Sequence, residues 1–198
     1  VLHTMGVFKN LGVEIWHEGT NVRITGQGIN HFVKPEKPLD MGNSGTSTRL
    51  LMGLLSRLPF DMQLIGDQSL SKRPMKRVRQ PLALMGAKIS LSENETLPGT
   101  IHANDHLSGI TYDMPIASAQ VKSAILLAGM QAEGETKIIE KIASRDHTER
   151  MLRQFGGEIT SKNGVITVSK QPKLIGQKIS VPSDISSAAF FIVAGLIT

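Results

Sequence analysis

The stretches Leu11-Gly-Val-Glu-Ile15, Leu84-Met-Gly-Ala-Lys-Ile89 and Gln154-Phe-Gly-Gly-Glu-Ile159 repeat one pattern along this 198-residue chain. Each stretch follows a run with helical periodicity and opens a short run of strand-forming residues. The aligned glycines lie about 70 residues apart, a spacing that indicates repeated supersecondary units. Such units can direct equivalent helix ends at one shared site, and the N-terminus of a helix attracts anions.

Two kinds of helix are predicted between the strands. The first kind, at residues 49–57, 121–130 and 188–197, follows small polar loops whose Asn, Ser and Asp side chains are good N-caps. The run Ala124-Ile-Leu-Leu-Ala-Gly-Met130 has no polar stripe, which is typical of a buried helix. Because soluble domains seldom bury several helices completely, we predict a layer of helices enclosed by sheets.

The second kind of helix is amphipathic and is predicted at residues 2–10, 74–84 and 147–154. Pro74 suits a first helical position, whereas Pro81 is expected to kink or break the same helix. Alternating or β-branched patterns predict strands at residues 13–16, 22–25, 62–65, 87–91, 100–102, 136–139, 158–160, 165–169 and 178–181. Both ends of the chain look cut from a longer periodic sequence.

Composition narrows the classes of function. The chain has no cysteine, so disulfides, thiolate metal sites and cysteine nucleophiles are excluded; this fits a reducing cytoplasm. No apolar run approaches the ~18 residues of a membrane span, and the scattered histidines predict no metal site. The net charge of +5 suits a nucleic acid or a small acidic substrate. The chain has only eight aromatic residues and none of them interleaves with a basic cluster, which disfavours nucleic acid.

Four short segments carry residues suited to anions. The loop from Gly42 to Arg49 combines hydroxyls, a guanidinium and Gly45, which allows close approach of a ligand. Lys72 and Arg73 precede a helix start, where the helix dipole disfavours cations unless an anion offsets them. The segments 118–122 and 144–147 are the other two. Taken alone, the loop 42–49 and the segments 118–122 and 144–147 are better explained as ordinary helix caps. For Lys72 and Arg73 the alternative is a solvated helix start, which the helix dipole makes less favourable.

Together the four segments resemble the motifs of the 5-enolpyruvylshikimate-3-phosphate (EPSP) synthase family, in the form often called class II in bacteria. They are Asn43-Ser-Gly-Thr-Ser-Thr-Arg49, Gly66-Asp-Gln-Ser-Leu-Ser-Lys-Arg-Pro-Met75, Ala117-Ser-Ala-Gln-Val-Lys-Ser-Ala124 and Ser144-Arg-Asp-His-Thr-Glu149. They occur in that family's order, and the similarity runs from Val1 to Thr198.

The resemblance implies transfer of the enolpyruvyl group of phosphoenolpyruvate to the 5-hydroxyl of shikimate 3-phosphate, with no metal or organic cofactor. It implies an inside-out α/β fold of repeated βαβαββ units, pseudo-threefold, with buried helices enclosed by sheets. Residues 1–182 would form the substrate-binding domain, whose first unit is incomplete. Residues 183–198 would begin the crossing back to a second domain.

The resemblance also assigns substrate-binding roles to motif positions. Gly45 matches a glycine beside phosphoenolpyruvate and the herbicide glyphosate, and Arg73 matches an arginine that grips phosphoenolpyruvate. Gln120 matches a residue near both ligands. The other matching positions are Ser118 and Ala119 for shikimate 3-phosphate, Arg145 for its phosphate, Asn43 for the shape of the loop and Thr46 as a minor contact.

This sequence also departs from the family pattern. The family's N-terminal Lys-Ser-x-x-x-Arg segment would precede Val1, and the acidic and basic catalytic residues of the C-terminal half fall outside this sequence. We therefore expect negligible turnover from this chain alone and a complementary C-terminal domain as its partner. The alternatives are a related transferase acting on UDP-N-acetylglucosamine, disfavoured by the missing cysteine, a non-catalytic anion-binding module and, last, an RNA-binding repeat protein.

Overall fold

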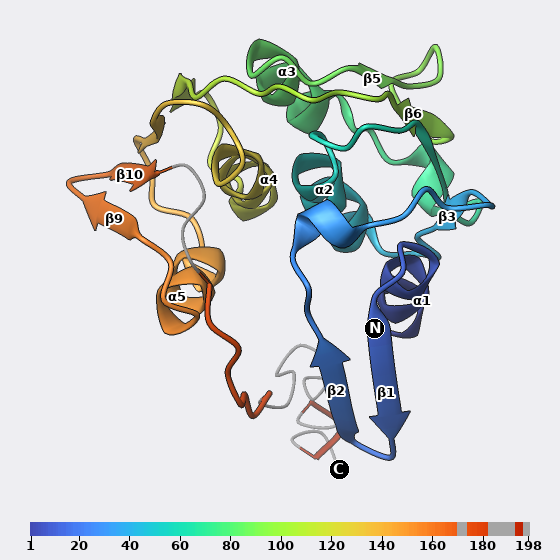
Figure 1. Cartoon of the computed structure of the whole chain (residues 1–198). Coiled ribbons are helices and arrows are strands. Elements are labelled where there is room, and N and C mark those ends of the chain that lie inside the picture. Colours follow the sequence, from blue (N-terminus) through green and yellow to red (C-terminus); the bar gives the residue numbers. More distant parts are fainter. Residues whose placement is uncertain (170–173, 182–192, 196–198) are drawn as a thin grey trace.

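The computed structural model describes residues 1–169, 174–181 and 193–195. The described residues form two four-stranded sheets, a two-stranded hairpin that extends away from them, and two helices at the centre (Figure 1). The described helices are α1 (Leu2–Asn10), α2 (Gly45–Leu54), α3 (Lys76–Leu84), α4 (Ala119–Gly129) and α5 (His147–Gln154), with short 3-10 turns at Ile29–His31 and Leu70–Lys72. None of these helices is long and apolar enough to cross a membrane.

Two of the sheets have four strands and the same topology. The first contains β3 (Leu39–Asp40), β4 (Met62–Ile65), β5 (Ile89–Ser90) and β6 (Gly99–Ile101), in the order β3-β4-β6-β5. The second contains β7 (Thr111–Met114), β8 (Thr136–Glu140), β9 (Ile159–Lys162) and β10 (Val165–Val168), in the order β7-β8-β10-β9. In each sheet the first two strands are parallel and the others antiparallel, so the predicted βαβαββ unit occurs twice.

The hairpin of β1 (Glu14–Glu18) and β2 (Asn21–Thr25) follows α1 as β5-β6 follows α3 and β9-β10 follows α5. The last part of the βαβαββ unit, a helix followed by two antiparallel strands, therefore occurs a third time. The helices α1, α3 and α5 each end in a Schellman motif. In each motif the N–H of a glycine donates to the carbonyl three residues earlier, and the N–H of the next residue donates to the carbonyl five residues earlier. The φ angles of these glycines are 87° for Gly12, 95° for Gly86 and 79° for Gly156.

The helices α2 and α4 form the centre of the core. Met52 of α2 and Ala124, Ile125 and Leu126 of α4 are completely buried. A Cβ on Gly53 would lie 2.1 Å from the carbonyl oxygen of Ala124, so the two backbones pack in direct contact. The prediction of buried inner helices is confirmed for α2 and α4, and the predicted helix at 188–197 lies mostly outside the described residues.

Several predicted boundaries are wrong. Helix α2 begins four residues earlier than predicted, because Ser44 caps it. Helix α3 begins at Lys76 and runs through Pro81 without ending; Pro81 is buried beside Val78 and Leu82, and this packing offsets the lost hydrogen bond. Residues 178–181 form no strand, and no described strand pairs with them.

Strands β3 and β7 were not predicted from the sequence. The two residues of β3 are too few to show a period. In β7 the pattern Thr-Tyr-Asp-Met leaves only Met114 buried, so alternation is weak. Both strands form because each pairs in parallel with the strand that follows a central helix.

Candidate anion-binding site at the N-termini of α2 and α4

The first turns of the two central helices lie side by side. Ser44 caps α2 by accepting a hydrogen bond of 3.1 Å from the Ser47 N–H, and Ser118 caps α4 with one of 3.4 Å from Val121. Gln120 joins the turns, since its amide donates to Thr46 Oγ1 at 2.8 Å. The positive ends of both helix dipoles therefore point at one region.

Two arginines occupy this region. Arg49 donates to Gln120 Oε1 at 2.7 Å and to the Pro74 carbonyl at 3.1 Å. Arg73 donates to Asn43 Oδ1 at 2.7 Å and to the Asn43 carbonyl at 3.3 Å. Among the residues that the structure describes, neither guanidinium forms an ion pair with a carboxylate, so both keep charge available for a ligand.

The two guanidinium groups flank Gly45. A Cβ built on Gly45 would lie 3.2 Å from Arg49 Nη1 and 3.3 Å from Arg73 Nη1. Any side chain at this position would push against one or both groups. The glycine thus lets the arginines approach the start of α2, next to its free N–H groups.

The electrostatics of the site favour a bound anion. Burial lowers the pKa of Arg49, and repulsion by Arg73 and Arg77 lowers it further. A lowered pKa means that the charged guanidinium is destabilised where it lies. An anion placed between Arg49 and Arg73 would remove that cost, because it would attract both groups.

Asp67 holds Asn43 in place beside Arg73. It accepts a hydrogen bond of 2.6 Å from the Asn43 amide and one of 2.7 Å from the Leu70 N–H. The hydrogen bond from Leu70, with that from Asn43, lowers the pKa of Asp67. The carboxylate orients Asn43 so that the amide oxygen of Asn43 faces Arg73.

The structure brings together most of the residues chosen from the sequence. Asn43, Gly45, Thr46, Arg73 and Gln120 form one connected group, and Ser118 and Ala119 begin the same turn of α4 as Gln120. Arg145 does not join that group directly: it is exposed on the turn before α5 and pairs with none of the described residues.

From the sequence, the guanidinium of Arg49 is among the groups suited to anions, but no role in binding a substrate is predicted for Arg49. Its position at the end of the loop resembles an ordinary exposed residue of a helix start. A sign of its role was available, since the predicted helix begins at Arg49, where an arginine would oppose the helix dipole.

Ser90, His102 and Asp61 form a second polar cluster on the outside of the β3-β4-β6-β5 sheet. Ser90 Oγ lies 2.7 Å from His102 Nε2, and His102 Nδ1 lies 3.3 Å from Asp61 Oδ2. The order resembles a hydrolase triad, but the imidazole and the carboxylate are 40% and 57% exposed. Asp61 also accepts the Ala103 N–H at 2.7 Å, so the cluster ties the ends of neighbouring strands together.

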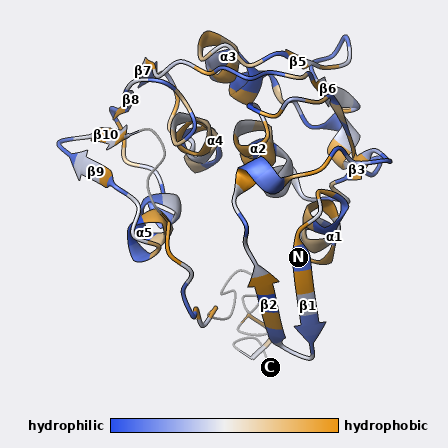
Figure 2. Ribbon diagram, in the orientation of Figure 1, coloured by the Kyte–Doolittle hydropathy of each residue, from blue (hydrophilic) through white to orange (hydrophobic). Residues whose placement is uncertain are grey.

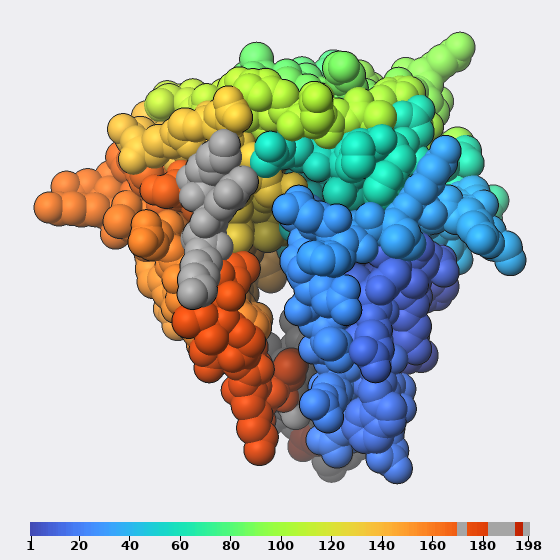
Figure 3. Space-filling model, in the orientation of Figure 1, coloured from blue at the N-terminus to red at the C-terminus, as the bar shows by residue number. Residues whose placement is uncertain are grey.

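A hollow lies near the C-terminal ends of the central helices, opposite the arginine site. Its volume is about 610 Å³, and its lining is mainly apolar, with Phe8, Ile24, Leu54 and Met130. It opens between the β1-β2 hairpin and the segment 174–181 (Figure 3). Figure 2 shows hydrophobic residues on the same hairpin. An apolar lining suits packing of further protein and not an anion.

The part of the chain that the structure describes contains no group of three His, Asp or Glu side chains able to hold a metal ion. The arginine site suits carboxylate or phosphate groups because it combines two guanidinium groups with helix N-termini and further hydrogen-bond donors.

Comparison with known proteins agrees with this chemistry. The sequence model of the EPSP synthase (3-phosphoshikimate 1-carboxyvinyltransferase) family matches residues 1–198. The chain is 72% identical to the 3-phosphoshikimate 1-carboxyvinyltransferase of Leuconostoc citreum, over 100% of this chain and 46% of that relative. It is 56% identical to the 3-phosphoshikimate 1-carboxyvinyltransferase of Lactococcus lactis subsp. cremoris strain MG1363, over 100% of this chain and 46% of that relative.

A solved structure of EPSP synthase from Acinetobacter baumannii matches with a TM-score of 0.91 and 52% identity, over 97% of this chain and 44% of that chain. The chain thus spans about half the length of the curated relatives it matches.

Proposed function

Because the chain belongs to the EPSP synthase family, we propose that the whole protein transfers the enolpyruvyl group of phosphoenolpyruvate to the 5-hydroxyl of shikimate 3-phosphate. Phosphate leaves in the elimination that follows addition. This is a step of aromatic amino acid biosynthesis, and we place it in the cytoplasm. The observation that carries the proposal is that the guanidinium groups of Arg49 and Arg73 flank Gly45 and that no carboxylate of the described part of the chain forms an ion pair with either.

The roles follow from charge and position. Arg73 and Arg49 would hold the carboxylate or phosphate of phosphoenolpyruvate beside Gly45, where glyphosate would also bind. Gln120 would lie between the two ligands, since it already bridges the two helix starts. The start of α4, with Ser118 and Ala119, would donate to shikimate 3-phosphate, and an exposed guanidinium at Arg145 would meet its phosphate.

This chain supplies binding and orientation. Holding both anions in one site converts a bimolecular reaction into an effectively unimolecular one. General acid and base groups must lie within hydrogen-bond reach of the transferred protons, and we place them outside this sequence. Residues 1–182 would form the substrate-binding domain, and residues 183–198, mostly outside the described residues, would lead to a complementary C-terminal domain. No cofactor is needed.

Calorimetric titration of the chain with shikimate 3-phosphate tests the proposal. Saturable binding that is lost in Arg145→Ala supports it. A folded chain that binds neither shikimate 3-phosphate nor phosphoenolpyruvate contradicts the assignment of the site. Adding a separately produced C-terminal half then distinguishes a transferase from a non-catalytic anion-binding module. Restored turnover supports the transferase, whereas binding without turnover supports the binding module.

A further inference from the structure

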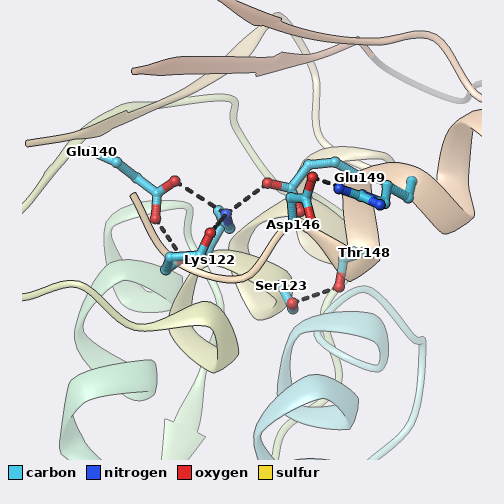
Figure 4. Close-up of polar contacts among 8 residues, drawn as sticks. Lys122, Ser123, Glu140, Asp146, Thr148 and Glu149 are labelled. Atoms are coloured by element: carbon cyan, nitrogen blue, oxygen red, sulfur yellow. Dashed lines mark hydrogen bonds and ion pairs between the residues drawn. The ribbon is translucent and has the colours of Figure 1, made fainter. Parts of the chain in front are cut away.

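A buried lysine lies directly behind the start of α4. Lys122 is 1% exposed and stands in the first turns of α4, after Ser118 and Gln120. Its ammonium lies 2.6 Å from Glu149 Oε1 in α5 and 3.0 Å from Glu140 Oε2 at the end of β8 (Figure 4). The side chains of both glutamates are also buried, with exposed fractions of 2% and 6%.

The cluster also holds the backbone of the turn between β8 and α5. Lys122 donates its remaining hydrogen bond to the Ser144 carbonyl, at 3.5 Å. The Ser144 hydroxyl donates to Glu140 Oε1 at 2.5 Å. Ser123, the residue after Lys122 in α4, and Thr148, the residue before Glu149 in α5, share a hydrogen bond of 2.6 Å (Figure 4). Residue 144 is thus fixed from two sides, immediately before Arg145.

Such a cluster is poorly explained by stability alone. Burying an ammonium and two carboxylates has a large desolvation cost, and apolar replacements of buried ion pairs are often neutral or stabilising. Glu149 Oε2 is buried and has no hydrogen-bond partner among the described residues, which adds to the cost. Directional contacts do, however, fix geometry more narrowly than apolar packing does.

The position of Arg145 depends on contacts made by neighbouring residues. Arg145 is exposed, it pairs with none of the described residues, and it lies in an irregular turn at residues 141–146. Its position relative to the start of α4 therefore depends on its neighbours in the turn and on α5. Both are connected to α4 through Lys122, Ser123 and their partners.

We propose that Lys122, held by Glu140 and Glu149, is a positioning residue that sets Arg145 at the correct distance from the N-terminus of α4 for the phosphate of shikimate 3-phosphate. The inference rests on the proposed function for its ligand. Lys122 itself is buried and does not touch the substrate. It acts by making the turn and the helix start one rigid unit.

The first test is a double-mutant cycle of Lys122→Met and Arg145→Ala, read by calorimetry with shikimate 3-phosphate. We expect Lys122→Met to weaken binding about tenfold or more, as expected for loss of one charge-assisted contact. In the Lys122→Met background, Arg145→Ala should have little further effect. Additive losses would overturn the proposal, because Arg145 would then work without Lys122. Ile138→Val, in the core of β8, controls for a general loss of packing.

The second test needs no ligand and separates this proposal from the proposed function. Hydrogen exchange should show faster exchange across residues 141–147 in Lys122→Met, with α4 and β8 still protected, and no such change in Ile138→Val. Unchanged exchange of the turn in a folded Lys122→Met chain overturns the proposal, whether or not the chain binds shikimate 3-phosphate. If the wild-type chain fails to bind but the turn loosens, only the proposed function fails.

Discussion

Replacing Gly53 by alanine should separate the two central helices. The added Cβ would lie 2.1 Å from the carbonyl oxygen of Ala124 and 2.8 Å from its Cα, so backbone must move. Overpacking of this severity costs about 3 kcal/mol, and the better helix propensity of alanine returns about 1 kcal/mol. The net loss of about 2 kcal/mol corresponds to a fall of about 4 to 8 °C in Tm for a chain of this size.

Gly6→Ala is the matched control. Gly6 also lies inside a helix, but a Cβ there meets nothing within 4 Å. The same substitution should therefore stabilise by up to about 1 kcal/mol and raise Tm by about 2 to 4 °C. Thermal unfolding followed by circular dichroism, with urea titration at 25 °C, measures both variants. Equal Tm values for the two variants would refute the argument that α2 and α4 are in backbone contact.

Three further outcomes are expected. Gly45→Ala should keep the fold but weaken phosphoenolpyruvate binding at least about fivefold, since a misplaced charge-assisted contact loses ~1 kcal/mol or more; calorimetry showing unchanged affinity would contradict this. Gln120→Ala should weaken binding of shikimate 3-phosphate about tenfold, the value of one well-placed hydrogen bond of ~1.4 kcal/mol, whereas the Thr46→Val control should cost less. The hydrogen bonds from Arg79 lower the pKa of Glu95, so this pair stabilises the fold above the ordinary carboxyl pKa and the effect is lost as pH falls through the lowered value. Glu95→Gln should therefore destabilise at pH 7 and have little effect at pH 2 in urea unfolding, and an equal effect at both pH values would exclude the role of this pair.

Local sequence was enough to predict the elements whose contacts are local. Helices α1 and α5 occur at the predicted residues, because their period and their Schellman glycines involve neighbours within one or two turns. The start of α2 was predicted too late because the serine that caps it is one of several equivalent polar residues in its loop. The predicted strand at 178–181 is absent because a strand needs a partner, and no described strand pairs with it.

The chain's sequence by itself determined the repeated unit, the buried character of α4 and the motifs that bear arginine and glycine. Only the tertiary structure decided which of these residues meet. Arg49 reaches Gln120 across 71 positions, and Lys122 finds its two glutamates on β8 and α5. A period of 3.6 or 2 residues records which face of an element is buried. The period does not indicate which charged side chains will meet once the helices and sheets have packed.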